Sequence, residues 1–181
     1  ELLLARGADV NKANDYGGTP LSIACDRGRL AVVELLLGRG ADINQADKFG
    51  GTPFVAACKE GHRALAELLL DRGALFNQAT PGEFGPLWVA CAHGRLAVVE
   101  LLLARGTDIN QVVDSDGFTP LYLACYGGHR QVVELLLERN ADINQALNSG
   151  ATTLSISCAR GHLAISELSL IHISEPTRRR T

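Results

Sequence analysis

Leucine-rich blocks and short polar stretches alternate at one fixed interval along the chain. The block Glu-Leu-Leu-Leu begins at five positions and a degraded copy, Glu-Leu-Ser-Leu, follows: Glu1, Glu34, Glu67, Glu100, Glu134 and Glu167. One cysteine and one asparagine per copy share this interval of 33 or 34 residues: Cys25, Cys58, Cys91, Cys125 and Cys158, with Asn11, Asn44, Asn77, Asn110 and Asn144. An interval of this length indicates that one supersecondary unit has been copied.

Each copy carries the signals of two short helices. In the first complete copy, Thr19 is placed to cap a helix that begins at Pro20 and ends before Gly28. Leucine and valine at helical spacing predict a second helix over 30–38, with Gly40 placed for a left-handed C-cap. Because two short helices cannot bury this much leucine alone, the copies must stack.

Two copies depart from the Thr-Pro signal at the start of the first helix. The third has Gly85-Pro86 and is expected to lack the hydroxyl cap. The fifth has Thr152-Thr153 and lacks the proline. These are local changes, so the same helix pair is expected in every copy.

The copies resemble the ankyrin repeat. Thr-Pro-Leu at 19–21 and Gly-Ala-Asp-Ile-Asn at 40–44 match the family pattern in phase with the repeat interval. The resemblance covers residues 1–167 and implies an all-α fold, an ankyrin-repeat solenoid of stacked antiparallel helix pairs with projecting β-hairpin loops. The expected units are a partial leading repeat at 1–13, repeats at 14–46, 47–79, 80–113 and 114–146, and a truncated repeat at 147–167.

Residues 168–181 leave the repeat pattern and resemble a translated sequencing-library adapter. We interpret them as a non-native tail, and the alternative is a degenerate last repeat with a basic end. Without the tail, 14 basic and 19 acidic residues give a net charge of −5 in place of −3. The lack of methionine and the start inside a leucine block predict a fragment of a longer array. We expect uncapped stacking faces at its ends to associate or fray.

Composition and charge exclude several classes of protein. With 46% hydrophobic and 20% charged residues, the chain has the composition of a folded protein. A net charge of −3 does not favour a nucleic-acid partner. Every apolar run is cut by charged residues or glycine, so no membrane span is expected. An odd number of cysteines at copied positions favours free thiols and an intracellular location, cytoplasmic or nuclear.

Cysteine and histidine recur four residues apart, as in Cys58 with His62 and Cys125 with His129. A glycine separates the members of each pair, so they do not share one continuous helix, and we interpret them as structural residues. No metal site, cofactor or catalytic constellation is predicted, and the chain is not expected to be an enzyme. The recurring asparagine is expected to tie neighbouring loops together. The resemblance implies the alternative that it is a target of an asparaginyl hydroxylase.

The positions that vary between copies indicate where a partner would bind. The resemblance places the hairpin tips and the inner face of the first helix along a concave groove, and four consecutive tips carry an aromatic residue. Binding and local packing of the hairpin are equal alternatives for these aromatics. The candidate partner-binding residues are Tyr16, Asp26, Arg27, Lys48, Phe49, Lys59, Glu60, Phe84, His93, Phe118 and Tyr126.

The predicted function is that of a non-catalytic scaffold for protein–protein interaction, with a protein partner of unknown identity. One alternative is a regulatory or targeting segment of a larger enzyme, such as a kinase or ubiquitin-ligase subunit. Another is a structural spacer within a long repeat array.

Overall fold

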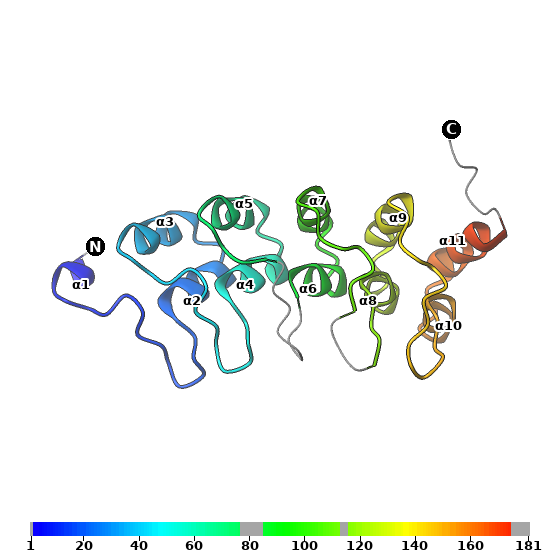
Figure 1. Ribbon diagram of the computed structural model, residues 1–181, viewed down its shortest axis with the longest axis horizontal. Coiled ribbons are helices and arrows are strands. Elements are labelled where there is room, and N and C mark those ends of the chain that lie inside the picture. The colour runs from blue at the N-terminus through cyan, green and yellow to red at the C-terminus, as the bar shows by residue number, and fades with distance from the viewer. Residues whose placement is uncertain (1, 77–84, 113–115, 175–181) are drawn as a thin grey trace.

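The computed structural model describes residues 2–76, 85–112 and 116–174, and its helices form two parallel rows (Figure 1). The first helices of the repeats make one row: α2 (Pro20–Asp26), α4 (Pro53–Glu60), α6 (Pro86–Ala92), α8 (Pro120–Gly127) and α10 (Thr153–Ala159). The second helices make the other: α3 (Leu30–Gly38), α5 (Arg63–Asp71), α7 (Leu96–Ala104), α9 (Arg130–Glu138) and α11 (Leu163–Ser174). A single turn, α1 (Leu2–Ala5), precedes them. The rows confirm the predicted all-α solenoid.

Local capping explains where the first-row helices begin. The Thr19 hydroxyl accepts a hydrogen bond from the amide of Ser22 at 3.1 Å, as predicted for α2. Gly85 caps α6 without a side-chain bond, as expected. At α10, Thr152 keeps the cap and Ser155 completes a capping box, so this helix begins correctly without a proline.

Packing between neighbouring repeats provides the core. Each first-row helix contacts the next helix of its row and the second helix of its own repeat. The buried apolar residues form one cluster along the stack. Its largest fully buried side chains include Phe54, Leu69, Leu102, Leu121, Leu136 and Ile165. No single repeat encloses these residues, so stability depends on the stack.

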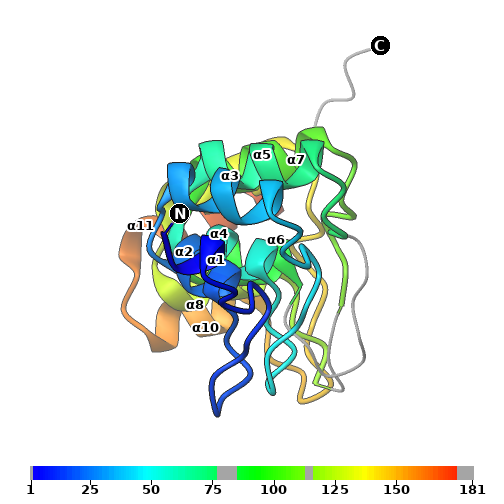
Figure 2. The same cartoon turned by 90° about the vertical axis from the view of Figure 1, so that its left-hand side faces the viewer.

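Loops project from the first row and hang side by side below it (Figures 1 and 2). The resemblance implied β-hairpins, but none of the described residues lies in a β-strand. The first loop is closed by only two backbone bonds, from Asn14 N to Gly18 O at 3.0 Å and from Gly17 N to Asn14 O at 2.9 Å. This pairing is too short to make a strand ladder, so the loops are hairpin-shaped turns.

The last helix, α11, continues through residue 168, where the tail was predicted to begin, and ends at Ser174. Within it, Ser169 is buried and donates its hydroxyl to the carbonyl of Ile165 at 3.0 Å. The foreign origin of 168–181 stays a prediction, and its last seven residues, 175–181, lie outside the described residues. None of the described helices has the length and apolar content required to cross a membrane.

Candidate protein-binding surface

A groove of about 270 Å³ lies between the first two repeats, where the loops meet the first-row helices. Two of the candidate residues, Asp26 on α2 and Lys59 on α4, line it. They occupy equivalent positions in neighbouring repeats. The other lining residues are Gly18, Ser22, Ile23, Asp47, Gly51, Thr52, Val55 and Ala56. The groove therefore combines apolar and uncharged surface with two carboxylates, Asp26 and Asp47, and one cation, Lys59.

Two aromatic rings stand at the loop tips of the same two repeats. Tyr16 is 71% exposed and Phe49 is 78% exposed. The amide of Lys48 donates to the carbonyl of Tyr16 at 3.1 Å, which holds the two tips together. A Cβ at Gly17 would lie 2.7 Å from the Lys48 nitrogen, so the loops are in close contact there. The exposed rings thus project from loops with fixed backbones.

The candidate aromatics of the fourth repeat have intramolecular partners instead. Phe118 is half-buried and its ring centroid lies 5.3 Å from that of Tyr122. The Tyr126 ring is partly exposed, and the guanidinium of Arg160 lies 3.8 Å above it. The pKa of the Tyr122 phenol lies above its ordinary value, and burial is the main cause. Phe84, the remaining candidate aromatic, lies outside the described residues.

Two further candidates, Glu60 and His93, make contacts with other residues of the stack. The Glu60 carboxylate lies 3.6 Å from the guanidinium of Arg95 in the next repeat and 3.6 Å from Lys59. The exposed His93 donates from its ring Nδ1 to the carbonyl of Val89 at 2.9 Å. The last candidate, Arg27, is exposed and pairs with its neighbour Asp26 at 3.6 Å. Exposed pairs of this kind contribute little stability and leave both groups able to meet a partner.

The recurring histidines join neighbouring repeats. His62 donates from Nε2 to the carbonyl of Asp26 at 3.2 Å, and His129 donates to the carbonyl of Ala92 at 3.0 Å. These bonds lie at the ends of first-row helices, where carbonyls lack helical partners. Within the described residues no group of histidine, cysteine and carboxylate side chains could hold a metal ion.

The copied cysteines are free thiols in the core, except the last. Burial raises the pKa of Cys25 and of Cys125 to about 12. Burial also raises the pKa values of Cys58 and Cys91. Such thiols stay protonated and are poor nucleophiles.

The recurring asparagines tie successive loops together, as predicted. The side-chain oxygen of Asn11 accepts from the amide of Asp42 at 2.8 Å, and that of Asn44 accepts from Leu75 at 2.9 Å. Asn110 repeats the contact with Asp142 at 2.9 Å. Asparagine hydroxylation stays a prediction.

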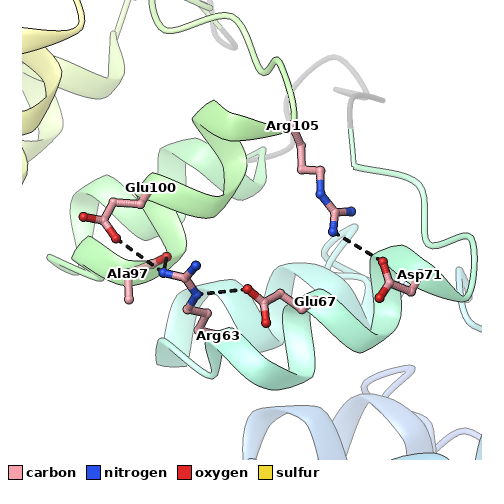
Figure 3. Close-up of polar contacts among 6 residues, drawn as sticks. All are labelled: Arg63, Glu67, Asp71, Ala97, Glu100 and Arg105. Atoms are coloured by element: carbon pink, nitrogen blue, oxygen red, sulfur yellow. Dashed lines mark hydrogen bonds and ion pairs between the residues drawn. The ribbon is translucent and has the colours of Figure 1, made fainter.

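Ion pairs on the second-row helices were not anticipated from the sequence (Figure 3). The guanidinium of Arg63 on α5 lies 3.0 Å from Glu67 and 3.3 Å from Glu100 on α7. Arg105 reaches back to Asp71 at 3.3 Å. The partners across repeats are 37 and 34 residues apart, one repeat plus a few positions. That spacing is the sequence signal that could have revealed them.

Sequence reasoning also missed the apolar part of the groove. Ile23 on α2 is exposed beside it, and Val55 on α4 is half-buried in it. The signal is an apolar residue on the same face of each first helix, as at Ile23, Ala56, Val89, Leu123 and Ile156. Exposure could not be read from that pattern, because Val89 and Leu123 are buried.

A family model described as ankyrin repeats (3 copies) matches three overlapping segments, residues 1–80, 40–113 and 87–179. The chain belongs to the ankyrin repeat family. A comparison with curated proteins gave no match. Ankyrin repeats are generally protein–protein interaction modules and are typically non-catalytic.

Proposed function

We propose that this ankyrin repeat chain binds a protein partner through the loop tips and the groove of its first two repeats. The exposure of Tyr16 and Phe49 on adjacent tips carries the proposal. Large exposed aromatics are costly in water and are common anchors of protein interfaces. Since the backbone bond between the tips already orders them, little conformational freedom is lost on binding.

The groove beside the tips supplies the complementary chemistry. Ile23 and Val55 favour an apolar side chain of the partner. Lys59 is the one cation among the residues that line the groove, and Asp26 and Asp47 are its two carboxylates; this uneven charge favours one direction of a bound segment over the other. Five free thiols support an intracellular, reducing location as part of the proposal.

Site-specific photo-cross-linking tests this function. A benzophenone amino acid at Phe49 should capture a protein from native extract, whereas the same probe at exposed Gln131 on α9 should not. Excess unlabelled chain should compete for the captured protein, and the double variant Tyr16→Ala/Phe49→Ala should not. If the double variant competes as well as the unmodified chain, or if the Gln131 probe captures the same protein, the proposed surface is wrong.

The alternative roles predict different results. A spacer within a long array should yield no cross-linked partner at either tip. A regulatory segment of a larger enzyme should bind a segment of that enzyme at the tips.

A further inference from the structure

Two tyrosines of the fourth repeat occupy positions that line the groove in the second repeat. Tyr122 corresponds to Val55, and Tyr126 corresponds to Lys59. The two tyrosines are one helical turn apart on α8, so their side chains share one face of that helix. Tyr122 is buried and Tyr126 is 46% exposed. The inner surface of the fourth repeat is therefore aromatic where that of the second is aliphatic and charged.

The guanidinium of Arg160, from the fifth repeat, is held against this tyrosine pair. The helices α8 and α10 pack side by side in the first row (Figure 1), and Arg160 directly follows α10. The Cζ of Arg160 lies 3.8 Å from the centroid of the Tyr126 ring, and its Nε donates to the Tyr126 carbonyl at 3.4 Å. Since the guanidinium is planar, stacking one face on the ring fixes the direction of its remaining donors.

These remaining donors of Arg160 are available to a ligand. Within the described part of the chain, Nη1 and Nη2 make neither a hydrogen bond nor an ion pair, and the side chain is exposed. None of α6, α8 and α10 carries a carboxylate, whereas α2 ends at Asp26 and α4 ends at Glu60. The charge of Arg160 is therefore not neutralised by the described first-row helices around it.

The Tyr122 hydroxyl lies within electrostatic reach of the same guanidinium. Burial raises the pKa of Tyr122, the ionised Tyr126 phenol raises it further, and the charge of Arg160 lowers it. Both charges act through space, so Tyr126 and Arg160 lie near the Tyr122 hydroxyl. The ring of Phe118, with its centroid 5.3 Å from that of Tyr122, packs against this tyrosine and limits its movement. The cluster is thus ordered before any ligand arrives.

We propose that Tyr122, Tyr126 and Arg160 form a site for a carboxylate side chain in an acidic segment of a partner protein. A guanidinium offers two parallel N–H donors to a carboxylate, and phenol hydroxyls can donate beside it. One guanidinium among uncharged phenols matches the single charge of a carboxylate, whereas phosphorylated segments are bound by clusters of arginines. The site lies between the fourth and fifth repeats, so it is separate from the groove between the first two and independent of the function proposed there.

Peptide libraries test the site on the full chain. The peptides carry glutamate, glutamine or phosphoserine at one central position, between the same sets of uncharged flanking sequences. Fluorescence anisotropy should show that the unmodified chain binds the best glutamate peptides about tenfold more tightly than their glutamine counterparts, as expected for hydrogen bonds to a charged group. Arg160→Gln should abolish this preference. Tyr126→Phe keeps the ring beneath the guanidinium and should weaken only glutamate binding.

Two matched controls separate this site from the rest of the inner surface. Arg27→Gln removes the same charge at the equivalent position of the first repeat and should keep the preference for glutamate. Phe49→Ala alters the loop tips and should keep it as well. Circular dichroism establishes that each variant is folded. Arg160→Lys retains the charge without the paired donors and should retain part of the preference, which loss of a merely structural contact would not produce.

Several results would overturn the proposal. A chain that binds no glutamate peptide contradicts it, as does equal binding of glutamate and glutamine peptides or a preference that survives Arg160→Gln. Tighter binding of phosphoserine than of glutamate would show that the site takes phosphate. Loss of glutamate binding in Phe49→Ala would assign the peptide to the loop tips. As a second readout, the Nε–H NMR signal of Arg160 should shift when a glutamate peptide is added, and an unchanged signal contradicts the contact.

Discussion

At the scale of single residues, the glycine between the helices of a repeat meets two separate requirements. Its backbone lies in the left-handed region, with φ +74° at Gly128 and +73° at Gly161. Side chains other than glycine are strained there by roughly 1–2 kcal/mol. At Gly128 the ring of His162 also lies directly over the glycine. Conformation and packing thus both select glycine at Gly128, and conformation alone selects it at Gly161.

Alanine at these two glycines should separate the two requirements. A Cβ at Gly128 would lie 2.6 Å from the His162 ring, and moving the ring weakens its 3.4 Å bond to the carbonyl of Tyr126. Gly161→Ala adds only the backbone strain. We expect Gly128→Ala to lower the free energy of unfolding by about 1–3 kcal/mol more than Gly161→Ala, the range for overpacking. Urea unfolding measures the free energy of unfolding of both variants. Equal losses would show that the His162 ring moves aside at no cost.

At the scale of elements, the loops are held by side chains rather than by strand pairing. The described side-chain bonds of the recurring asparagines Asn11, Asn44 and Asn110 cross from one repeat to the next. Asp108 and Asp142 meanwhile accept from the amides two residues later and shape their own turns. The asparagine bonds link loops of neighbouring repeats, and the Asn77 member of the series lies outside the described residues.

Asparagine substitutions should show how much this connection contributes. Asn110→Ala removes a bond to the next repeat and should lower the free energy of unfolding by about 1 kcal/mol, a typical net value for one hydrogen bond. Asn144 occupies the same motif in the fourth repeat, but its side chain makes no such bond within the described residues. Asn144→Ala should therefore have a smaller effect. Urea unfolding measures the free energy of unfolding of both variants. Equal losses would show that the asparagine acts within its own turn and not through the bond to the next repeat.

The elements also show which features are predictable from sequence. The limits of α2 and α3 follow from Thr19-Pro20, Gly28 and Gly40, because caps and left-handed turns act within a few residues. The end of α11 at Ser174 was not predicted, since the departure from the repeat pattern carries no local helix stop.

The site is less predictable than the helices because exposure depends on neighbouring repeats. Tyr16 and Phe118 are both aromatic residues near loop tips, yet one is exposed and the other packs on Tyr122. The histidines recur with a cysteine of their own repeat, but their observed partners are carbonyls of the preceding repeat. Such contacts depend on how the repeats stack, which the interval alone does not specify.

At the scale of the whole molecule, four of the stacked repeats each bury one thiol, which makes the stack sensitive to alkaline pH. Burial raises the pKa values of Cys25, Cys58, Cys91 and Cys125 above a thiol's ordinary pKa of about 9. Above that pH, thiols of the unfolded chain lose protons that the folded chain retains. Fewer protons bound in the unfolded state mean that stability falls as pH rises. The thiol contribution is thus fully present below pH 9 and is lost as pH rises toward 12 and above.

Removing one buried thiol should therefore flatten the decline of stability with pH. Cys125→Ala should reduce the slope by about 0.7 kcal/mol per pH unit at pH 9, where half of the unfolded thiol is ionised, and by close to about 1.4 kcal/mol per pH unit between pH 10 and 11. Val132→Ala, at a buried site without a thiol, should lower stability at every pH and leave the slope unchanged. Urea unfolding of both variants and the unmodified chain across this range measures the slopes. Other groups that titrate there are common to all three proteins, so parallel curves for Cys125→Ala and the unmodified chain would show that the thiol at Cys125 ionises equally in both states.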